Sequence, residues 1–224
     1  MNSRASRRLA AFLVAAWLCA LARSPAYAQE PKPDAPETPE AATAPAWSWT
    51  AAVALYAVPD EANYLQPGVA ADRGLLHLEA RYNYEAQKTF SVWAGMNFAA
   101  GETVTMEFTP MFGVITGDLD GVAPGFLLTL SAWKLTFYSE GEFVFDAGDE
   151  PENFFYNWSE LTIQPTEWFR AGLVTQRTRA YQTERDIQRG LLVGVNFWKG
   201  SLTTNVFEPF SGSPAVVVQF GVEF

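Results

Sequence analysis

The feature that most constrains this chain is a period-two alternation of apolar and polar residues, which recurs in short segments from Trp47 to the C-terminus. Between residues 75 and 85, for example, the even positions carry Leu76, Leu78, Ala80, Tyr82 and Tyr84, and the odd positions carry His77, Glu79, Arg81, Asn83 and Glu85. Successive side chains of a β-strand point to opposite faces, so the pattern predicts strands with one apolar and one ionic face. No run of about 18 apolar residues follows the N-terminal segment, which excludes membrane-spanning helices from the rest of the chain.

The alternation divides residues 47–224 into twelve segments separated by turn residues. They span 47–57, 63–71, 75–85, 89–98, 103–113, 122–131, 135–146, 153–164, 168–179, 186–197, 200–207 and 215–224. Connections after the even-numbered segments are short, whereas those after the odd-numbered segments include the long polar stretches 116–121, 147–152, 180–185 and 208–214. An even number of strands with short turns at one end and longer loops at the other is typical of bacterial outer-membrane barrels. We therefore predict an all-β fold, a transmembrane antiparallel up-and-down β-barrel of about 12 strands.

A soluble β-sandwich also alternates, but its polar face meets water and tends to be rich in lysine. After Trp47 the chain has only Lys88, Lys134 and Lys199, all at predicted turns. Charged residues make up 18% of the chain, below the roughly 25% of soluble proteins. Three tryptophans lie at the short turns, where an aromatic girdle at the membrane boundary is expected, although core tryptophans are the alternative. They are Trp133, Trp168 and Trp198.

The N-terminal residues predict a signal peptide for export, followed by a linker that precedes the barrel. Residues 1–28 carry arginines, an apolar run over 9–21 and an A-x-A site at 26–28, which indicates a cleaved signal peptide. A membrane anchor is the alternative, but the apolar run is short for one and is followed by Arg23 and Pro25. Residues 29–46 read QEPKPDAPETPEAATAPA and have no large apolar residue, so we predict a disordered periplasmic linker. Residues 47–224 then form the barrel domain.

The C-terminus ends in Phe220-Gly221-Val222-Glu223-Phe224, with aromatic residues at the last and fifth-last positions. Together with the signal peptide and the alternation, this ending makes residues 47–224 resemble a Gram-negative outer-membrane β-barrel protein. The segments YSEGEFVFD (138–146), NFFYNWSEL (153–161) and QRTRAYQTERDIQRG (176–190) resemble those of an uncharacterised family of such barrels. The resemblance implies residence in the bacterial outer membrane, and it implies that Phe220 and Phe224 belong to the signal read by the barrel assembly machinery. It implies no activity.

The side chains predicted to face the barrel interior are compatible with two functions. The alternation places an acidic set of side chains toward the lumen: His77, Glu79, Arg81, Glu107, Glu140, Glu142, Glu160 and Arg170. In the first reading they line a narrow, hydrated channel for small solutes that favours cations. In the second, a closed salt-bridge network of Glu79, Arg81, Glu107, Glu140, Glu142 and Arg170 plugs a structural barrel. Twelve strands are compatible with both, and the channel is the interpretation we favour.

The outer surface suggests a lipid partner. Arg177, Arg179 and Arg189 lie on the outward face near the predicted external loop 180–185. Arginine binds phosphate through two parallel hydrogen bonds, so contact with the phosphates of lipopolysaccharide is one hypothesis. Ion pairs with Glu184 and Asp186 within the loop are the other.

Several functions are excluded or disfavoured by composition. A formal net charge of −10 gives no reason to bind nucleic acid. The only cysteine is Cys19, in the predicted signal peptide, and the only histidine is His77, so no disulfide scaffold, zinc cluster or cofactor is expected. A lipid-acting outer-membrane enzyme is a disfavoured alternative, because it would need a serine and a histidine facing lipid while His77 is predicted inside. We expect a monomeric barrel without catalytic residues, surrounded by outer-membrane lipid.

Overall fold

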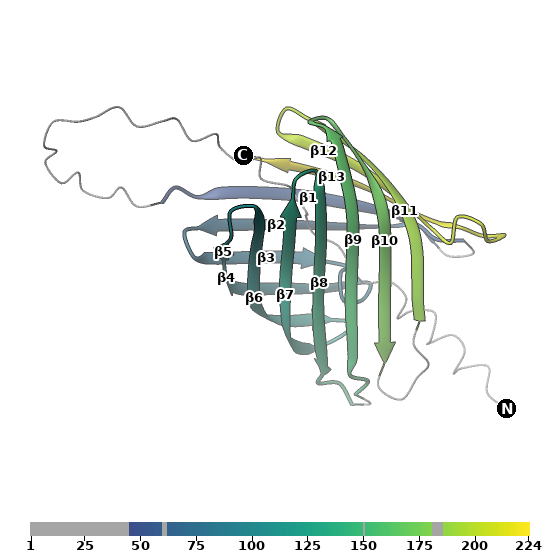
Figure 1. Cartoon of the computed structure of the whole chain (residues 1–224). Helices are drawn as coiled ribbons and strands as arrows, with labels where there is room; N and C mark the ends of the chain where they lie inside the picture. Colours follow the sequence, from purple (N-terminus) through teal and green to yellow (C-terminus); the bar gives the residue numbers. More distant parts are fainter. Residues whose placement is uncertain (1–44, 60–61, 150, 181–185) are drawn as a thin grey trace, which may run out of the picture.

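The computed structural model describes residues 45–59, 62–149, 151–180 and 186–224 (Figure 1). The predicted signal peptide and residues 29–44 of the predicted linker lie outside this part of the chain. The strands are β1 (Ser48–Ala57), β2 (Tyr64–Arg73), β3 (Leu76–Tyr82), β4 (Thr89–Met96), β5 (Phe98–Ala100), β6 (Val104–Gly117), β7 (Gly121–Ala132), β8 (Leu135–Asp146), β9 (Phe154–Thr166), β10 (Phe169–Ala180), β11 (Asp186–Phe197), β12 (Gly200–Phe207) and β13 (Ala215–Glu223). No helix within the described residues is long and apolar enough to cross a membrane.

The strands close into a single antiparallel barrel, whose curved wall is visible in Figure 1. Neighbours along the wall are also neighbours in sequence, except that β13 returns to pair with β1, with Thr50 opposite Glu223. Both β4 and β5 pair with β6, which makes them two halves of one interrupted strand. The barrel therefore has 12 strands, and the predicted fold class is confirmed.

The interruption between β4 and β5 has a local cause. The register is continuous across it, because Gly95 lies opposite Met111 and Phe98 lies opposite Phe108. Pro110 on β6 falls within the gap and has no amide hydrogen to donate, so the ladder cannot continue there. On the other side of the strand, the backbone amide of Asn97, the residue between the two halves, donates to the carbonyl of Leu75 at 2.8 Å and extends the pairing of β4 with β3.

The two faces of the wall are inverted relative to a soluble protein. On β3, Leu76, Leu78 and Tyr82 are exposed, whereas His77, Glu79 and Arg81 are buried. The same outward apolar side chains occur around the barrel, including Phe90, Val92, Phe112, Val114, Leu161, Leu173, Leu191, Val193 and Phe220. Exposed apolar side chains on so many strands are typical of a barrel wall that faces lipid.

One predicted orientation is wrong. Tyr84 was expected to share the outward face of Leu76 and Leu78, but its side chain is buried with 1% exposure. The reason is that β3 ends at Tyr82 and the next residue, Asn83, has a positive φ of 58°. A left-handed residue breaks the alternation of an extended strand, and asparagine tolerates that conformation well. Tyr84 and Glu85 therefore both enter the barrel.

The three tryptophans at the short turns lie on the surface at one end of the barrel. Trp133 and Trp198 adopt left-handed conformations at the turn tips, with φ of 55° and 50°. They are 84% and 96% exposed, and Trp168 is 60% exposed, so none is a core residue. The same rim holds the start of β1 and the end of β13, where Trp49 and Phe224 exchange two backbone hydrogen bonds of 3.0 Å.

Large side chains fill much of the barrel interior. A buried cluster joins inward residues from many strands: Tyr56, Tyr84, Trp93, Met111, Ile115, Tyr138, Phe154, Tyr156, Trp158, Val174, Leu192, Phe207 and Val217. Trp158 and Tyr156 have 0% exposure. The interior of the described barrel is thus a mixture of aromatic and ionic groups, and its charged members form the candidate site.

Candidate functional site

The charged centre of the interior is Arg81 on β3. Its Nη2 atom donates to Glu79 Oε2 at 2.7 Å, and its Nη1 atom lies 3.4 Å from Glu142 Oε2. The guanidinium carbon is 4.0 Å from the ring centroid of Tyr84 and 4.7 Å from that of Trp93. Two carboxylates and two aromatic faces thus surround one cation. We call Glu79, Tyr84, Trp93 and Glu142 the Arg81 cage.

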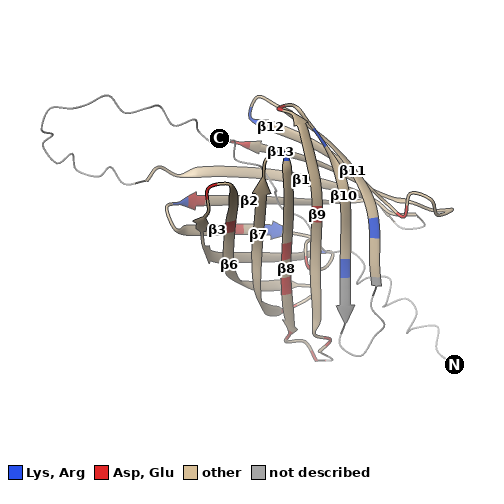
Figure 2. Ribbon diagram, viewed as in Figure 1, with Lys and Arg blue, Asp and Glu red and all other residues tan. Residues whose placement is uncertain are grey.

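The cage brings together parts of the wall that are far apart. Glu79 and Trp93 are direct cross-strand partners on β3 and β4. Glu142 lies on β8, and β4, β6 and β7 separate it from β3 along the wall. The Arg81–Glu142 contact therefore crosses the interior instead of following the sheet. Figure 2 shows the acidic (red) segments within β8 that supply this side of the contact.

Hydrogen bonds fix the aromatic members of the cage. Tyr84 donates its hydroxyl to Glu140 Oε1, and Tyr138 donates to Glu140 Oε2 at 2.7 Å. On the other side, Trp93 Nε1 donates to Ser91 Oγ at 3.1 Å, and Ser91 Oγ in turn donates to Glu85 Oε1 at 2.6 Å. These bonds orient both rings with their faces toward Arg81.

Two glycines make room for Trp93. Gly113 on β6 is the cross-strand partner of Trp93, and a Cβ atom there would lie 2.5 Å from the indole ring. A Cβ atom on Gly125 of β7 would lie 3.0 Å from the same ring. A real Cβ atom essentially never comes as close as the first of these distances, so Gly113 allows the ring to lie across the wall. The small residues of β6 and β7 thus help to position the cage.

A second buried ion pair is separate from the cage. Arg170 on β10 lies with Nη1 3.5 Å from Glu160 Oε2, and its Nη2 donates to Thr203 Oγ1 at 2.8 Å. Trp158 donates its indole N–H to Glu160 Oε1 at 3.3 Å and packs edge-to-face on Phe207, with centroids 5.3 Å apart. The pair therefore ties β9, β10 and β12 together through side chains.

A third polar chain leads from the short-turn rim to the cage. His77 Nδ1 lies 2.8 Å from Asp72 Oδ1, and His77 Nε2 lies 3.6 Å from Glu79 Oε2. Asn97 donates to the same Asp72 oxygen at 2.5 Å and accepts from Thr109 at 2.6 Å. His77 thus lies between two carboxylates. This arrangement is typical of an ion pair in a barrel interior, whereas a catalytic base lies beside a nucleophile.

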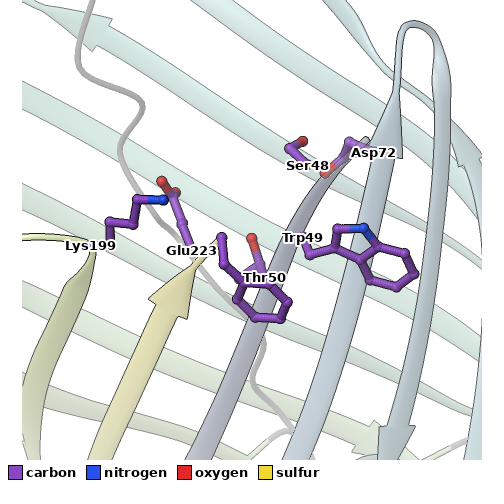
Figure 3. A pocket seen from close by; sticks show the side chains of 7 residues that line it. Ser48, Trp49, Thr50, Asp72, Lys199 and Glu223 are labelled. Atoms are coloured by element: carbon purple, nitrogen blue, oxygen red, sulfur yellow. The ribbon is translucent and has the colours of Figure 1, made fainter. Parts of the chain in front are cut away.

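A small cavity of about 250 Å³ lies on the same rim (Figure 3). It is lined by Ser48, Trp49, Thr50, Asp72, Lys199, Glu223 and Phe224. Figure 3 shows the charged ends of Lys199 and Glu223 at one side of the cavity, and Trp49, Ser48 and Asp72 at the other. Among the described residues, no group of three or more His, Cys, Asp or Glu side chains is placed to hold a metal ion.

The predicted lumen residues are placed as follows. His77, Glu79, Arg81, Glu140, Glu142, Glu160 and Arg170 are buried inside the barrel. Glu107 is exposed on β6 near the short turns, away from the cage. The six residues of the predicted salt-bridge network therefore do not form a single network. Glu107 is away from the other five, and Arg170 pairs with Glu160 instead. Sequence reasoning missed Tyr84, Trp93 and Trp158 as interior residues, although Trp93 shares the parity of Ser91.

Two of the three arginines predicted on the outer surface lie near each other on neighbouring strands. Arg177 on β10 and Arg189 on β11 both belong to the outward face, since the adjacent positions Gln176 and Gly190 are buried and successive residues of a strand alternate between faces. Thr175 is the direct partner of Arg189, which places Arg177 diagonally across the strand pair. The guanidinium of Arg177 lies 5.6 Å from the ring of Phe155. Arg179 lies two residues beyond Arg177 on β10.

Comparisons with known proteins support the architecture. No protein-family model and no curated protein matches the chain. A solved structure described as "KdgM porin" aligns with a TM-score of 0.53 at 9% identity, covering 78% of this chain and 99% of that one. Another, "KdgM porin in complex with disordered oligogalacturonate", aligns with a TM-score of 0.51 at 10% identity, covering 79% and 98%. At this identity the likeness shows the fold alone, a closed antiparallel β-barrel like that of these two porins.

Proposed function

We propose that the protein is an outer-membrane channel for small solutes whose narrow interior favours cations. The observation that carries this proposal is the excess of carboxylates inside the barrel. Five buried glutamates, Glu79, Glu85, Glu140, Glu142 and Glu160, accompany two buried arginines, Arg81 and Arg170. A carboxylate-lined passage lowers the electrostatic energy of a cation and raises that of an anion. The porin-type fold supports a transport role.

The Arg81 cage would be the narrowest part of this channel. Its residues have exposures of 5% or less, so the cage itself leaves no space for a solute in the described conformation. A plugged structural barrel is the second candidate function, and the same burial favours it. The two differ in whether the Arg81 side chain leaves the cage. Either function places the short-turn rim in the periplasm and the longer loops outside the cell.

Conductance in a planar bilayer tests the channel. We expect the refolded protein to pass a steady current in a potassium chloride gradient. The sign of the reversal potential should show that potassium permeates more readily than chloride. Glu142→Gln should lower the potassium-to-chloride permeability ratio at least about twofold, because it removes a charge from the narrowest level. Glu152→Gln, in the exposed connection before β9, is the matched control and should leave the ratio unchanged.

Two results would contradict the channel. The first is silence from a barrel whose folding is verified by heat-modifiable migration, which would favour the plugged structural protein. The second is current that favours chloride. One structurally similar porin was solved with oligogalacturonate, an anionic sugar chain. The carboxylate excess leads us to expect that this anion neither passes nor blocks the present channel.

We also propose that Arg177, Arg179 and Arg189 contact lipopolysaccharide. The outward positions of Arg177 and Arg189 on neighbouring strands support this, because two guanidinium groups on one face suit a phosphate group. The double substitution Arg177→Ala/Arg189→Ala should reduce the lipopolysaccharide that co-purifies with the barrel by about half or more. Lys88→Ala, in the exposed turn before β4, is the control. Equal lipopolysaccharide in all three proteins would remove this proposal.

A further inference from the structure

The Arg81 cage has the composition of a binding site for an organic cation. A guanidinium group is recognised by carboxylates that accept its N–H donors and by aromatic rings that meet its flat face. Both kinds of group are present, with Glu79 and Glu142 as acceptors and Tyr84 and Trp93 as faces. The site is buried on every side and is filled by a side chain of the protein itself.

More carboxyl groups surround the cage than the single guanidinium of Arg81 can pair with. Besides Glu79 and Glu142, Glu140 accepts from Tyr84 within the same cluster, and Glu85 accepts from Trp93. Within the described residues, Glu142 Oε1 and Glu85 Oε2 are buried and have no hydrogen-bond partner. Unpaired buried carboxylate oxygens are unfavourable, so a further donor that reached them would be stabilised.

Replacing Arg81 in the cage by another cation costs less free energy than moving Arg81 out and leaving the cage empty. Moving Arg81 out without a replacement would leave two or more carboxylates buried and unpaired, which is strongly unfavourable. A solute with a guanidinium or ammonium group would make the same hydrogen bonds and ring contacts as Arg81 does. The guanidinium group of Arg81 lies at the end of a flexible side chain. It can therefore leave the cage without breaking a backbone hydrogen bond between strands. A cation of matching chemistry would therefore restore the partners of Glu79 and Glu142, at the cost of moving the Arg81 guanidinium to water or to another acceptor.

We propose that the Arg81 cage is a binding site for small organic cations, guanidinium compounds above all, which Arg81 occupies while the barrel is closed. A permeating cation takes its place as the Arg81 side chain moves aside. This inference deepens the proposed channel function and rests on it for its physiological meaning. It assigns the substrate class to solutes that carry a guanidinium or primary ammonium group.

The variant Arg81→Ala empties the cage and allows a direct test with guanidinium chloride. We expect this variant, refolded as the full mature chain, to conduct more than the wild type in sodium chloride. Guanidinium at low millimolar concentration should reduce that current and change the tryptophan fluorescence, to which Trp93 in the cage contributes, while additional sodium at equal ionic strength should do neither. Arg170→Ala is the matched control, because Arg170 is also buried beside a glutamate but has no aromatic face among its described contacts.

Folding provides a second measurement if Arg81→Ala is unstable. In that case guanidinium should raise the fraction of heat-modifiable folded barrel at concentrations far below those that denature proteins, and sodium should not. Identical effects of guanidinium and sodium on current, fluorescence and folding yield would overturn the site. An equal effect of guanidinium on Arg170→Ala would also overturn it.

The outcomes for the site and for the channel are distinguishable. If the wild type is silent but Arg81→Ala binds guanidinium, the cation site stands and the channel proposal fails. If the wild type is cation-selective but Arg81→Ala is insensitive to guanidinium, the channel stands and the site fails.

Discussion

Trp158→Ala should lower the free energy of unfolding of the barrel by about 3–5 kcal/mol, the largest effect we expect from a single truncation. Trp158 is 0% exposed, packs on Phe207 and donates to Glu160. Its removal would leave a cavity inside the barrel and an acceptor without its donor. The measurement is denaturant unfolding in lipid vesicles or micelles, followed by heat-modifiable migration on gels, which does not depend on Trp158 fluorescence.

The matched control for Trp158 is another aromatic side chain that makes little contact. Phe210 lies in the connection before β13 and is 96% exposed, so Phe210→Ala should change stability by less than about 0.5 kcal/mol. A cost for Trp158→Ala no greater than that of Phe210→Ala would mean that Trp158 does not pack inside the barrel. If the protein is a channel, Trp158→Ala should also raise its conductance, because it removes a bulky group from the interior.

Arg170→Met should lower stability by about 3–5 kcal/mol, because it leaves the carboxylate of Glu160 buried without its cation. Glu160 is 1% exposed and Arg170 is 8% exposed, so water does not screen the loss effectively. The substitution also removes the hydrogen bond from Arg170 to Thr203. Denaturant unfolding of the variant against the wild type, in the same micelles, measures the difference.

The double variant Arg170→Met/Glu160→Gln separates the two contributions. The glutamine keeps an acceptor for the indole N–H of Trp158 and removes the unpaired charge, so most of the stability should return, to within about 1 kcal/mol of the wild type. If the double variant is as unstable as Arg170→Met alone, the uncompensated charge is not the cause. Stability of Arg170→Met equal to the wild type would show that the pair is hydrated in solution.

The wall of this barrel was predictable because it follows from local geometry. Alternation on β3 put Leu76 and Leu78 outside and His77 and Glu79 inside, and the even number of segments allowed the last strand to pair antiparallel with the first. The exception was Tyr84, whose direction depends on the left-handed conformation of Asn83. The split of one predicted strand into β4 and β5 depends on Pro110, which lies on a different strand.

Function was predictable only as far as the class of fold, and the acidic, cation-favouring character of the interior stays a prediction. The sequence placed acids inside but left open whether they line water or one another. Arg81 and Glu142 are far apart in the chain and meet across the interior, so their contact depends on the diameter and stagger of the closed barrel. No alternation pattern contains that information. The aromatic members of the cage were missed for different reasons: Tyr84 is turned inward by the left-handed Asn83, and Trp93 was missed although it shares the inward parity of Ser91.

By itself the sequence determined which face of each strand is apolar and that the strands close into a barrel, because side-chain direction in a strand is set residue by residue. The tertiary structure alone decided which inward residues touch. Tyr84 and Trp93 enclose Arg81 only because hydrogen bonds to Glu140 and Ser91 turn their rings toward it, and because Gly113 leaves the space. Those contacts join separate strands across the interior, and they form only when the whole wall has closed.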